Sequence, residues 1–119
     1  MSENKKRVLH IEDDPDLQDY VAAIIGDKVD IINASSLKEG YDSLGSSKFD
    51  LILLDLTLPD GSGIDLLNSL SERVASIPPV VIFSAHDVTN TLPHVEEVLV
   101  KGRFNDENLL TIIIDLLKI

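Results

Sequence analysis

The sequence predicts a doubly wound α/β fold, in which a parallel β-sheet carries helices on both faces. Three observations lead to this prediction. Five short apolar runs alternate with segments whose apolar residues recur at helical spacing. The runs are apolar throughout, as in strands that are buried on both sides. Parallel strands also need crossover connections, and those are usually helical.

Composition limits the class of protein. The chain has 119 residues, of which 44% are hydrophobic, which suffices for one domain with a single core. We expect a flexible segment at residues 1–6 and the domain at residues 7–119. The net charge of −11 repels phosphate backbones, so direct nucleic-acid binding is not expected. No apolar run approaches the ~20 residues of a membrane span. Together with the absence of cysteine, this favours a cytoplasmic protein with no membrane partner.

The first strand and helix are indicated by residues 8–11, an apolar run that stops at Glu12. Within the run, His10 is expected to be a buried, hydrogen-bonded core histidine without a catalytic role. Asp14 and the proline after it have the pattern of an N-cap and first helical position. Gly26 supplies the end of this helix.

The second unit repeats this order. Residues 29–32 form a β-branched run, which predicts a strand. Ser36 is followed three residues later by Glu39, which is the spacing of a capping box. In that motif each of the two side chains accepts a hydrogen bond from the backbone N–H of the other residue. A second helix is therefore expected to begin after Ser36.

The third run covers residues 50–54 and ends at Asp55. Pro59, Asp60 and Gly61 then supply the residue types of a turn. A third helix is expected after this turn. The residues predicted for its apolar face are Ile64, Leu67, Leu70 and Val74.

The last third of the chain contains two more strands and a closing helix. Residues 80–83 form the fourth run and residues 97–100 the fifth. Asn105 is a suitable N-cap for the helix that follows. The residues expected on its buried side are Leu109, Leu110, Ile113 and Leu117.

Polar residues stand at the ends of four of these strands. In doubly wound sheets, ligands bind beyond the carboxyl ends of the strands, near the point where the strand order reverses. The flavodoxin-like order 2-1-3-4-5 places that point between strands one and three. The residues concerned are Glu12, Asp13 and Asp14 after strand one, Asp55 after strand three, Ser84 after strand four and Lys101 after strand five. We expect them to meet on one rim.

The residue types on this rim suit metal binding and phosphoryl transfer. Carboxylates held close together raise one another's pKa unless a hard cation neutralises them, and Mg²⁺ prefers oxygen ligands. Asp13 and Asp55 are candidates for direct ligation, Glu12 for ligation through water, and a backbone carbonyl after Asp55 for a further position. A carboxylate also accepts a phosphoryl group where positive charge and hydrogen-bond donors meet the incoming oxygens. Lys101 supplies the charge, and Ser84 supplies a hydroxyl.

Four segments of the chain resemble the signature segments of response-regulator receiver domains. They are residues 8–14, 53–63, 83–85 and 100–101. The resemblance spans nearly the whole chain, and it implies a phosphoacceptor of a two-component system rather than a turnover enzyme acting on an external substrate. The phosphoryl donor would be a histidine kinase or a histidine phosphotransfer protein. The output partner is not identified by the resemblance.

The same resemblance assigns roles to individual residues. The groups that act on the phosphoryl group are Asp55 as acceptor, Ser84 as the switch hydroxyl and Lys101 as the cation that pairs with the phosphate. The Mg²⁺ ligands are Glu12, Asp13, Asp55 and the backbone carbonyl of Thr57.

Three features depart from the family pattern. Val98 stands where an aromatic switch residue is usual, three positions before Lys101, and Gly102 stands where a proline is usual. The segment between Ser84 and Lys101 is short and contains Pro93, so the fourth helix is expected to be shortened or irregular. These departures lie on the surface through which receivers generally report phosphorylation.

Other functions remain as alternatives. A haloacid-dehalogenase-like phosphatase needs a second acid where this chain has Thr57, and a flavin-binding module would have its phosphate repelled by three consecutive acids after the first strand. A degenerate receiver, which binds partners without being phosphorylated, is favoured by Val98 and Gly102. The sequence also leaves open whether the chain is a stand-alone shuttle, a receiver from a hybrid histidine kinase or a fragment of a longer regulator.

Overall fold

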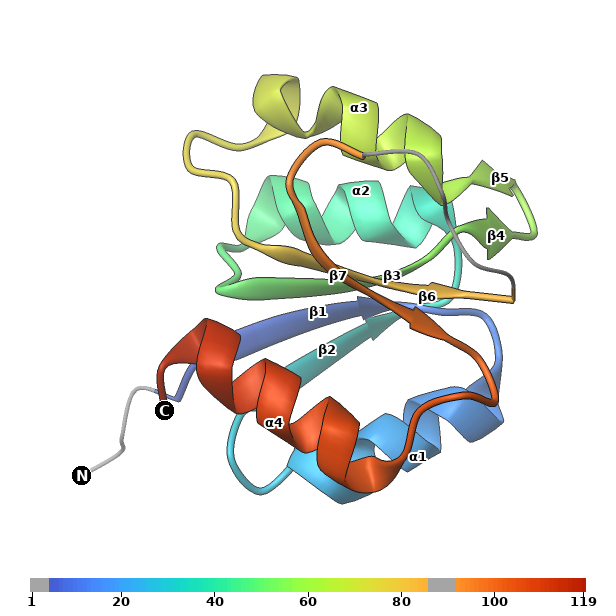
Figure 1. Ribbon diagram of the computed structural model, residues 1–119. Helices are drawn as coiled ribbons and strands as arrows, with labels where there is room; N and C mark the ends of the chain where they lie inside the picture. The colour runs from blue at the N-terminus through green and yellow to red at the C-terminus, as the bar shows by residue number, and fades with distance from the viewer. Residues whose placement is uncertain (1–4, 86–91) are drawn as a thin grey trace.

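The computed structural model describes residues 5–85 and 92–119 (Figure 1). Its helices and strands, in chain order, are β1 (Arg7–Ile11), α1 (Pro15–Ile25), β2 (Asp30–Ala34), α2 (Leu37–Ser46), β3 (Leu51–Asp55), β4 (Thr57–Leu58), β5 (Gly61–Ser62), α3 (Gly63–Arg73), β6 (Val80–Ser84), β7 (Val95–Val100) and α4 (Asp106–Leu117). Most of the predicted flexible segment, residues 1–6, lies outside the described residues.

Five of the strands form one parallel sheet in the order β2-β1-β3-β6-β7. Because β4 and β5 form a separate antiparallel pair, β6 and β7 are the predicted fourth and fifth strands. The predicted order 2-1-3-4-5 is therefore confirmed. Helices α2 and α3 cover one face of the sheet, and α1 and α4 cover the other (Figure 1).

The core consists of two apolar layers, one on each face of the sheet. Every residue of β3 and β6 is buried, and successive side chains alternate between the two layers. Ile52 and Leu54 pack in the layer below α2 and α3, whereas Leu51 and Leu53 pack in the layer below α1 and α4. Burial on both faces explains why these strands appear in the sequence as unbroken apolar runs.

Most of the predicted helix starts are confirmed, but the capping box of α2 is only half formed. Asp14 caps α1, and Asn105 caps α4. In α2 the Ser36 hydroxyl accepts a hydrogen bond from the Glu39 backbone N–H, 3.1 Å away. The Glu39 carboxylate does not return to Ser36, because it accepts instead from the backbone N–H of Ser35 at 2.8 Å.

Several predicted boundaries and faces differ from the structure. Ile64 is 37% exposed, so its placement on the buried face of α3 was wrong; Leu66 is buried there together with Leu67 and Leu70. Leu110 of α4 is half-buried rather than inside. Strand β7 begins at Val95, two residues before the predicted start. The β4–β5 hairpin was predicted only as a turn.

The predicted fourth helix falls mainly on residues 86–91, which lie outside the described residues. The next residues, 92–94, lead directly into β7 and are not helical. In the part of the chain that the structure describes, no helix is long and apolar enough to cross a membrane.

Candidate functional site

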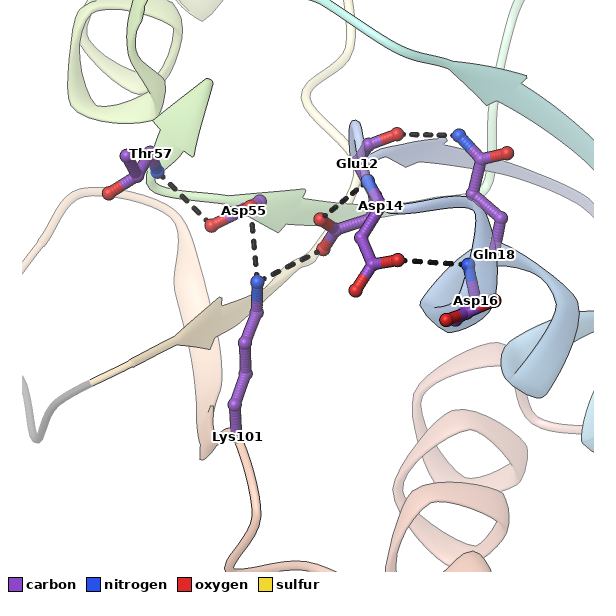
Figure 2. A network of polar contacts seen from close by, with 7 residues as sticks. All are labelled: Glu12, Asp14, Asp16, Gln18, Asp55, Thr57 and Lys101. Carbon is purple, nitrogen blue, oxygen red and sulfur yellow. Dashed lines mark hydrogen bonds and ion pairs between the residues drawn. The ribbon is translucent and has the colours of Figure 1, made fainter. Parts of the chain in front are cut away.

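The carboxyl ends of four parallel strands meet at one edge of the sheet. Glu12 directly follows β1, Asp55 is the last residue of β3, Ser84 is the last residue of β6 and Lys101 directly follows β7. Residues that are far apart in sequence are therefore neighbours at this edge, as the strand order predicts. Figure 2 shows the polar contacts among several of these side chains.

Three carboxylates form the centre of the site. Glu12, Asp13 and Asp55 each offer an oxygen, and these oxygens all lie within 4.8 Å of one another. Glu12 is completely buried and Asp55 is 4% exposed, whereas Asp13 faces solvent. Like charges at this separation repel strongly where water is excluded.

Lys101 provides the counter-charge (Figure 2). Its ammonium lies 3.2 Å from Asp55 Oδ2 and 3.4 Å from Glu12 Oε1. Partial burial lowers the pKa of Lys101, but the carboxylates of Asp55 and Glu12 together outweigh this effect, so its pKa is raised above the ordinary value. The lysine therefore stays charged, yet one ammonium compensates only part of the charge of three carboxylates.

Of the three carboxylates, Glu12 has an environment that clearly disfavours its ionised form. Burial, and then the nearby Asp55 carboxylate, raise the pKa of Glu12 to about 7. Its Oε2 accepts a weak hydrogen bond from the Asp14 backbone N–H at 3.2 Å. Its Oε1 is buried without a hydrogen-bond donor among the described residues and has only the ion pair with Lys101. An additional cation at this position would satisfy that oxygen and favour the ionised carboxyl.

Asp55 is held on both sides. Its Oδ1 accepts a hydrogen bond from the Thr57 backbone N–H at 3.1 Å, and its Oδ2 pairs with Lys101 (Figure 2). Gly63 lies against the backbone of the same residue: a Cβ added there would be 2.4 Å from the Asp55 carbonyl oxygen. Only glycine permits this approach, and the Asp55 side chain is thereby presented at a fixed place on the rim.

Ser84 and Lys101 are linked through the backbone. The Lys101 N–H donates to the Ser84 carbonyl oxygen at 2.8 Å, and Ser84 itself is 8% exposed. Asp55 pairs with Phe83 in the β3–β6 ladder, so the serine that follows Phe83 lies beside the end of β3. Thr57 stands two residues after Asp55 in β4, and its contribution of a carbonyl ligand stays a prediction.

Gln18 is a part of the site that the sequence did not indicate. Its side-chain amide donates to the Glu12 carbonyl oxygen at 2.5 Å and to the Ser35 hydroxyl at 3.3 Å. Gln18 lies four positions after the N-cap Asp14, so the two residues are neighbours on the same face of the first turn of α1. That spacing is a weak signal, because it places a side chain near the cap without identifying what it contacts.

His10 differs from its prediction. It is fully buried, as expected, but neither ring nitrogen has a hydrogen-bond partner among the described residues, so the expected hydrogen bond was wrong. Its ring packs against Phe83, with centroids 5.7 Å apart, in the apolar layer covered by α1 and α4. Burial lowers the pKa of His10 to about 4, and the side chain is therefore neutral near pH 7.

The three carboxylates fit a hard divalent cation. Mg²⁺ is bound in proteins by carboxylate and carbonyl oxygens, with water in the remaining positions. The cluster supplies three such oxygens and has charge that Lys101 does not compensate. The specific observation that favours an ion here is the buried Glu12 Oε1, which has the Lys101 ion pair but no hydrogen-bond donor among the described residues.

Comparison with known proteins relates the chain to one family. A family model described as response regulator receiver domain matches residues 8–112. The chain is 34% identical over 80 residues to response regulator protein PilR of Pseudomonas aeruginosa, an alignment that covers 66% of this chain and 18% of PilR. It is 38% identical over 79 residues to the KDP operon transcriptional regulatory protein KdpE of Escherichia coli, covering 66% of this chain and 34% of KdpE. The chain thus spans well under two thirds of these relatives.

Solved structures show the same architecture. The signal receiver domain described as that of a Luxo repressor protein from Vibrio parahaemolyticus superposes with a TM-score of 0.84 at 28% identity, covering 96% of this chain and 91% of that one. A CheY-like receiver domain protein from Methanospirillum hungatei superposes with a TM-score of 0.85 at 22% identity, covering 97% and 95%. At the lower identity, the second comparison supports the fold alone.

Proposed function

This chain belongs to the response regulator receiver domain family, and we propose that it is a phosphoacceptor of two-component signalling in which Asp55 takes the phosphoryl group. The observation that carries the proposal is the gathering of the Glu12, Asp13 and Asp55 carboxylates within 4.8 Å. The Lys101 ammonium, which pairs with two of them, adds the positive charge that an incoming phosphoryl group requires.

In the proposed reaction, a carboxylate oxygen of Asp55 attacks the phosphorus of a phosphohistidine. A P–O bond forms and the P–N bond breaks; the leaving imidazole nitrogen keeps the electron pair and takes a proton from solvent. The donor is a histidine kinase or a histidine phosphotransfer protein. Lys101 pairs with the transferred group, and the Ser84 hydroxyl donates a hydrogen bond to one of its oxygens.

Mg²⁺ is the proposed cofactor. Its ligands from this chain are Glu12, Asp13, Asp55 and the backbone carbonyl of Thr57. When bound, the ion neutralises the carboxylates and orients the phosphoryl oxygens. The carboxylates of this chain supply hard oxygen donors, and the buried Glu12 oxygen lacks a hydrogen-bond donor among the described residues.

The chain on this proposal promotes its own phosphorylation and is not a turnover enzyme on an external substrate. The modified domain then changes its affinity for an output partner or for a further region of a longer protein. Relatives such as KdpE are named as transcriptional regulators, but this chain matches only 34% of KdpE. We therefore assign no nucleic-acid contact to the chain itself, and we place it in the cytoplasm.

A second candidate is a receiver that binds partners without phosphorylation. Two departures from the family pattern, in β7 and directly after it, favour this candidate. Val98 stands at the position of the usual aromatic residue. Gly102 stands at the position of the usual proline and has φ +83°, a conformation that proline does not adopt. The complete set of polar groups around Asp55 favours phosphorylation instead.

Incubation with acetyl phosphate and Mg²⁺, followed by intact-mass measurement, separates the two candidates. A phosphoryl adduct is expected on the wild-type protein, because Asp55 is held by the Thr57 N–H and lies beside the Lys101 ammonium. The adduct should disappear in Asp55→Asn and when a chelator removes the metal.

Asp27→Asn is the matched control, since Asp27 is an exposed carboxylate in the α1–β2 connection, away from this edge. It should be modified like the wild type. An unchanged wild-type mass under all conditions would contradict the proposal and favour the phosphorylation-independent module. An adduct that persists in Asp55→Asn would contradict the assignment of the acceptor to Asp55.

A further inference from the structure

The β4–β5 hairpin, which immediately follows Asp55, is fastened to the start of α2. At its tip, the two carboxylate oxygens of Asp60 accept hydrogen bonds from the backbone N–H groups of Leu37 at 2.8 Å and Lys38 at 3.0 Å. These are first-turn N–H groups of a helix, which have no partner within the helix itself. The same two bonds lower the pKa of Asp60, so its side chain is an anion at neutral pH.

Apolar contacts reinforce this attachment. Gly61 has φ +148°, and a Cβ added to it would be 2.8 Å from the Leu37 side chain, so the hairpin lies directly on the first residue of α2. Leu58, on the other strand of the hairpin, is buried in the same apolar layer as Leu37. A backbone hydrogen bond closes the base of the hairpin: the Gly63 N–H donates to the Leu56 carbonyl oxygen at 2.9 Å.

The residues that lead from β2 into α2 support the acidic loop on the other side of the site. The Glu12 N–H donates to the Ala34 carbonyl oxygen at 2.8 Å. Gln18 bridges the Glu12 carbonyl oxygen and the Ser35 hydroxyl. Ala34 and Ser35 therefore hold the loop that carries Glu12 and Asp13, and Leu37 and Lys38, directly after them in this short segment, hold the hairpin that carries Thr57.

We propose that Asp60 is a positioning residue: by tying the β4–β5 hairpin to the start of α2, it fixes Thr57 relative to Glu12 and Asp13. This inference rests on the proposed function, because it concerns the proposed Mg²⁺ ligands. Asp60 is not one of the proposed ligands of the ion, and both of its carboxylate oxygens accept from backbone N–H groups of α2. It acts through the backbone, 22 and 23 positions away from its partners in sequence.

The test measures the Mg²⁺ dissociation constant of the unphosphorylated protein by calorimetry. Asp60→Ala should weaken Mg²⁺ binding roughly tenfold, the lower end of the loss seen when groups that orient metal ligands are removed. Asp60→Asn should restore most of the affinity, because its amide oxygen still accepts from one of the two N–H groups. Rescue by this variant distinguishes hydrogen bonding from charge.

Ser36→Ala is the matched control. It removes the other side-chain cap of α2, the hydroxyl that accepts from Glu39 N–H, but leaves the hairpin attachment in place. Thermal unfolding without metal should show a similar loss of stability for Ser36→Ala and Asp60→Ala, while only Asp60→Ala loses Mg²⁺ affinity. Asp65→Asn, an exposed carboxylate in the first turn of α3, controls for the loss of one negative charge near the site.

Equal loss of affinity in Ser36→Ala and Asp60→Ala would overturn the inference, because the role would then be general stability. Unchanged affinity in Asp60→Ala would overturn it as well. A wild-type protein that binds Mg²⁺ but takes no phosphoryl group would contradict the proposed function while leaving this comparison of affinities intact.

Discussion

At the residue scale, the protonation of Glu12 links the site to stability. Its pKa rises from an ordinary value of 4.5 to about 7 in the folded protein. Between these values the folded protein binds more protons than the unfolded chain, so stability falls as pH rises through this window. Since each pKa unit corresponds to about 1.4 kcal/mol, ionised Glu12 costs the metal-free protein up to about 3 kcal/mol.

The protonation of His10 has the opposite effect on the pH dependence of stability, and the two effects must be separated. Its pKa falls from 6.5 to about 4, so the folded protein binds fewer protons than the unfolded chain between these values. Stability therefore rises with pH in that range and opposes the effect of Glu12. Above pH 6.5 the contribution of His10 fades, because the unfolded chain also loses the His10 proton there, and the trend of Glu12 becomes the larger of the two.

We predict that between pH 6.5 and pH 8 the metal-free wild type loses about 1 kcal/mol of unfolding free energy relative to Glu12→Gln, in which the contribution of His10 is the same. At pH 8 the variant should be more stable than the wild type by about 1–3 kcal/mol, because the amide removes the buried charge. Urea unfolding in the presence of a chelator measures both values. Glu72→Gln, an exposed position, should behave like the wild type. A variant with the same pH dependence as the wild type would contradict the assignment to Glu12.

At the element scale, the connection between β7 and α4 differs from the family pattern at Gly102. The residue has φ +83°, and the neighbouring Arg103 N–H donates to the Val100 carbonyl oxygen at 2.9 Å in a tight turn. Proline fixes φ near −65°, so the residue that the family usually has here does not fit this backbone. The glycine is thus required by the geometry of the turn that follows Lys101.

We predict that Gly102→Pro destabilises the protein by about 2 kcal/mol or more, and Gly102→Ala by about 1 kcal/mol, because φ is positive at this position. Gly45→Ala is the control: it lies within α2, and an added Cβ meets no atom within 4 Å. That substitution should stabilise the protein by roughly 0.5–1 kcal/mol. Chemical denaturation measures all three. A Gly102→Pro protein as stable as the wild type would show that the turn adopts another conformation.

The helices and strands also differ in how well the sequence predicts them. Helices α1 and α4 begin where Asp14 and Asn105 predict, because an N-cap is a local signal. The start of β7 was missed because the exposed Glu96 separates Val95 from the run predicted at residues 97–100, and the register of the strand is irregular there. The β4–β5 hairpin was missed because its attachment depends on Asp60 and α2, whose contact is not visible in a local pattern.

At the scale of the whole molecule, the strand order predicts where the site lies. Once the apolar runs are arranged as 2-1-3-4-5, the ends of four strands fall on one edge, and Glu12, Asp55 and Lys101 become neighbours. The position of the site follows from topology. Its support does not, because the hydrogen bonds of Gln18 and Asp60 join backbone segments whose separation is set by the finished fold.

The whole-molecule charge gives the last prediction. The chain has a net charge of −11, and three of its carboxylates lie together at the proposed Mg²⁺ site. A ligand that binds only the folded state stabilises it by about 2.7 kcal/mol at a concentration 100 times its dissociation constant. We therefore predict that saturating Mg²⁺ raises the midpoint of thermal unfolding by several degrees.

Any salt also screens the self-repulsion of so acidic a chain, so the control is KCl at equal ionic strength, which should raise the midpoint less than MgCl₂ does. Asp13→Asn is the matched variant, because Asp13 is the exposed carboxylate of the cluster and its replacement leaves the buried contacts of Glu12 and Asp55 in place. It should keep the response to KCl and lose most of the additional response to Mg²⁺. Equal shifts with the two salts in the wild type would mean that Mg²⁺ acts by screening alone, and the assignment of a metal site to this edge of the sheet would then fail.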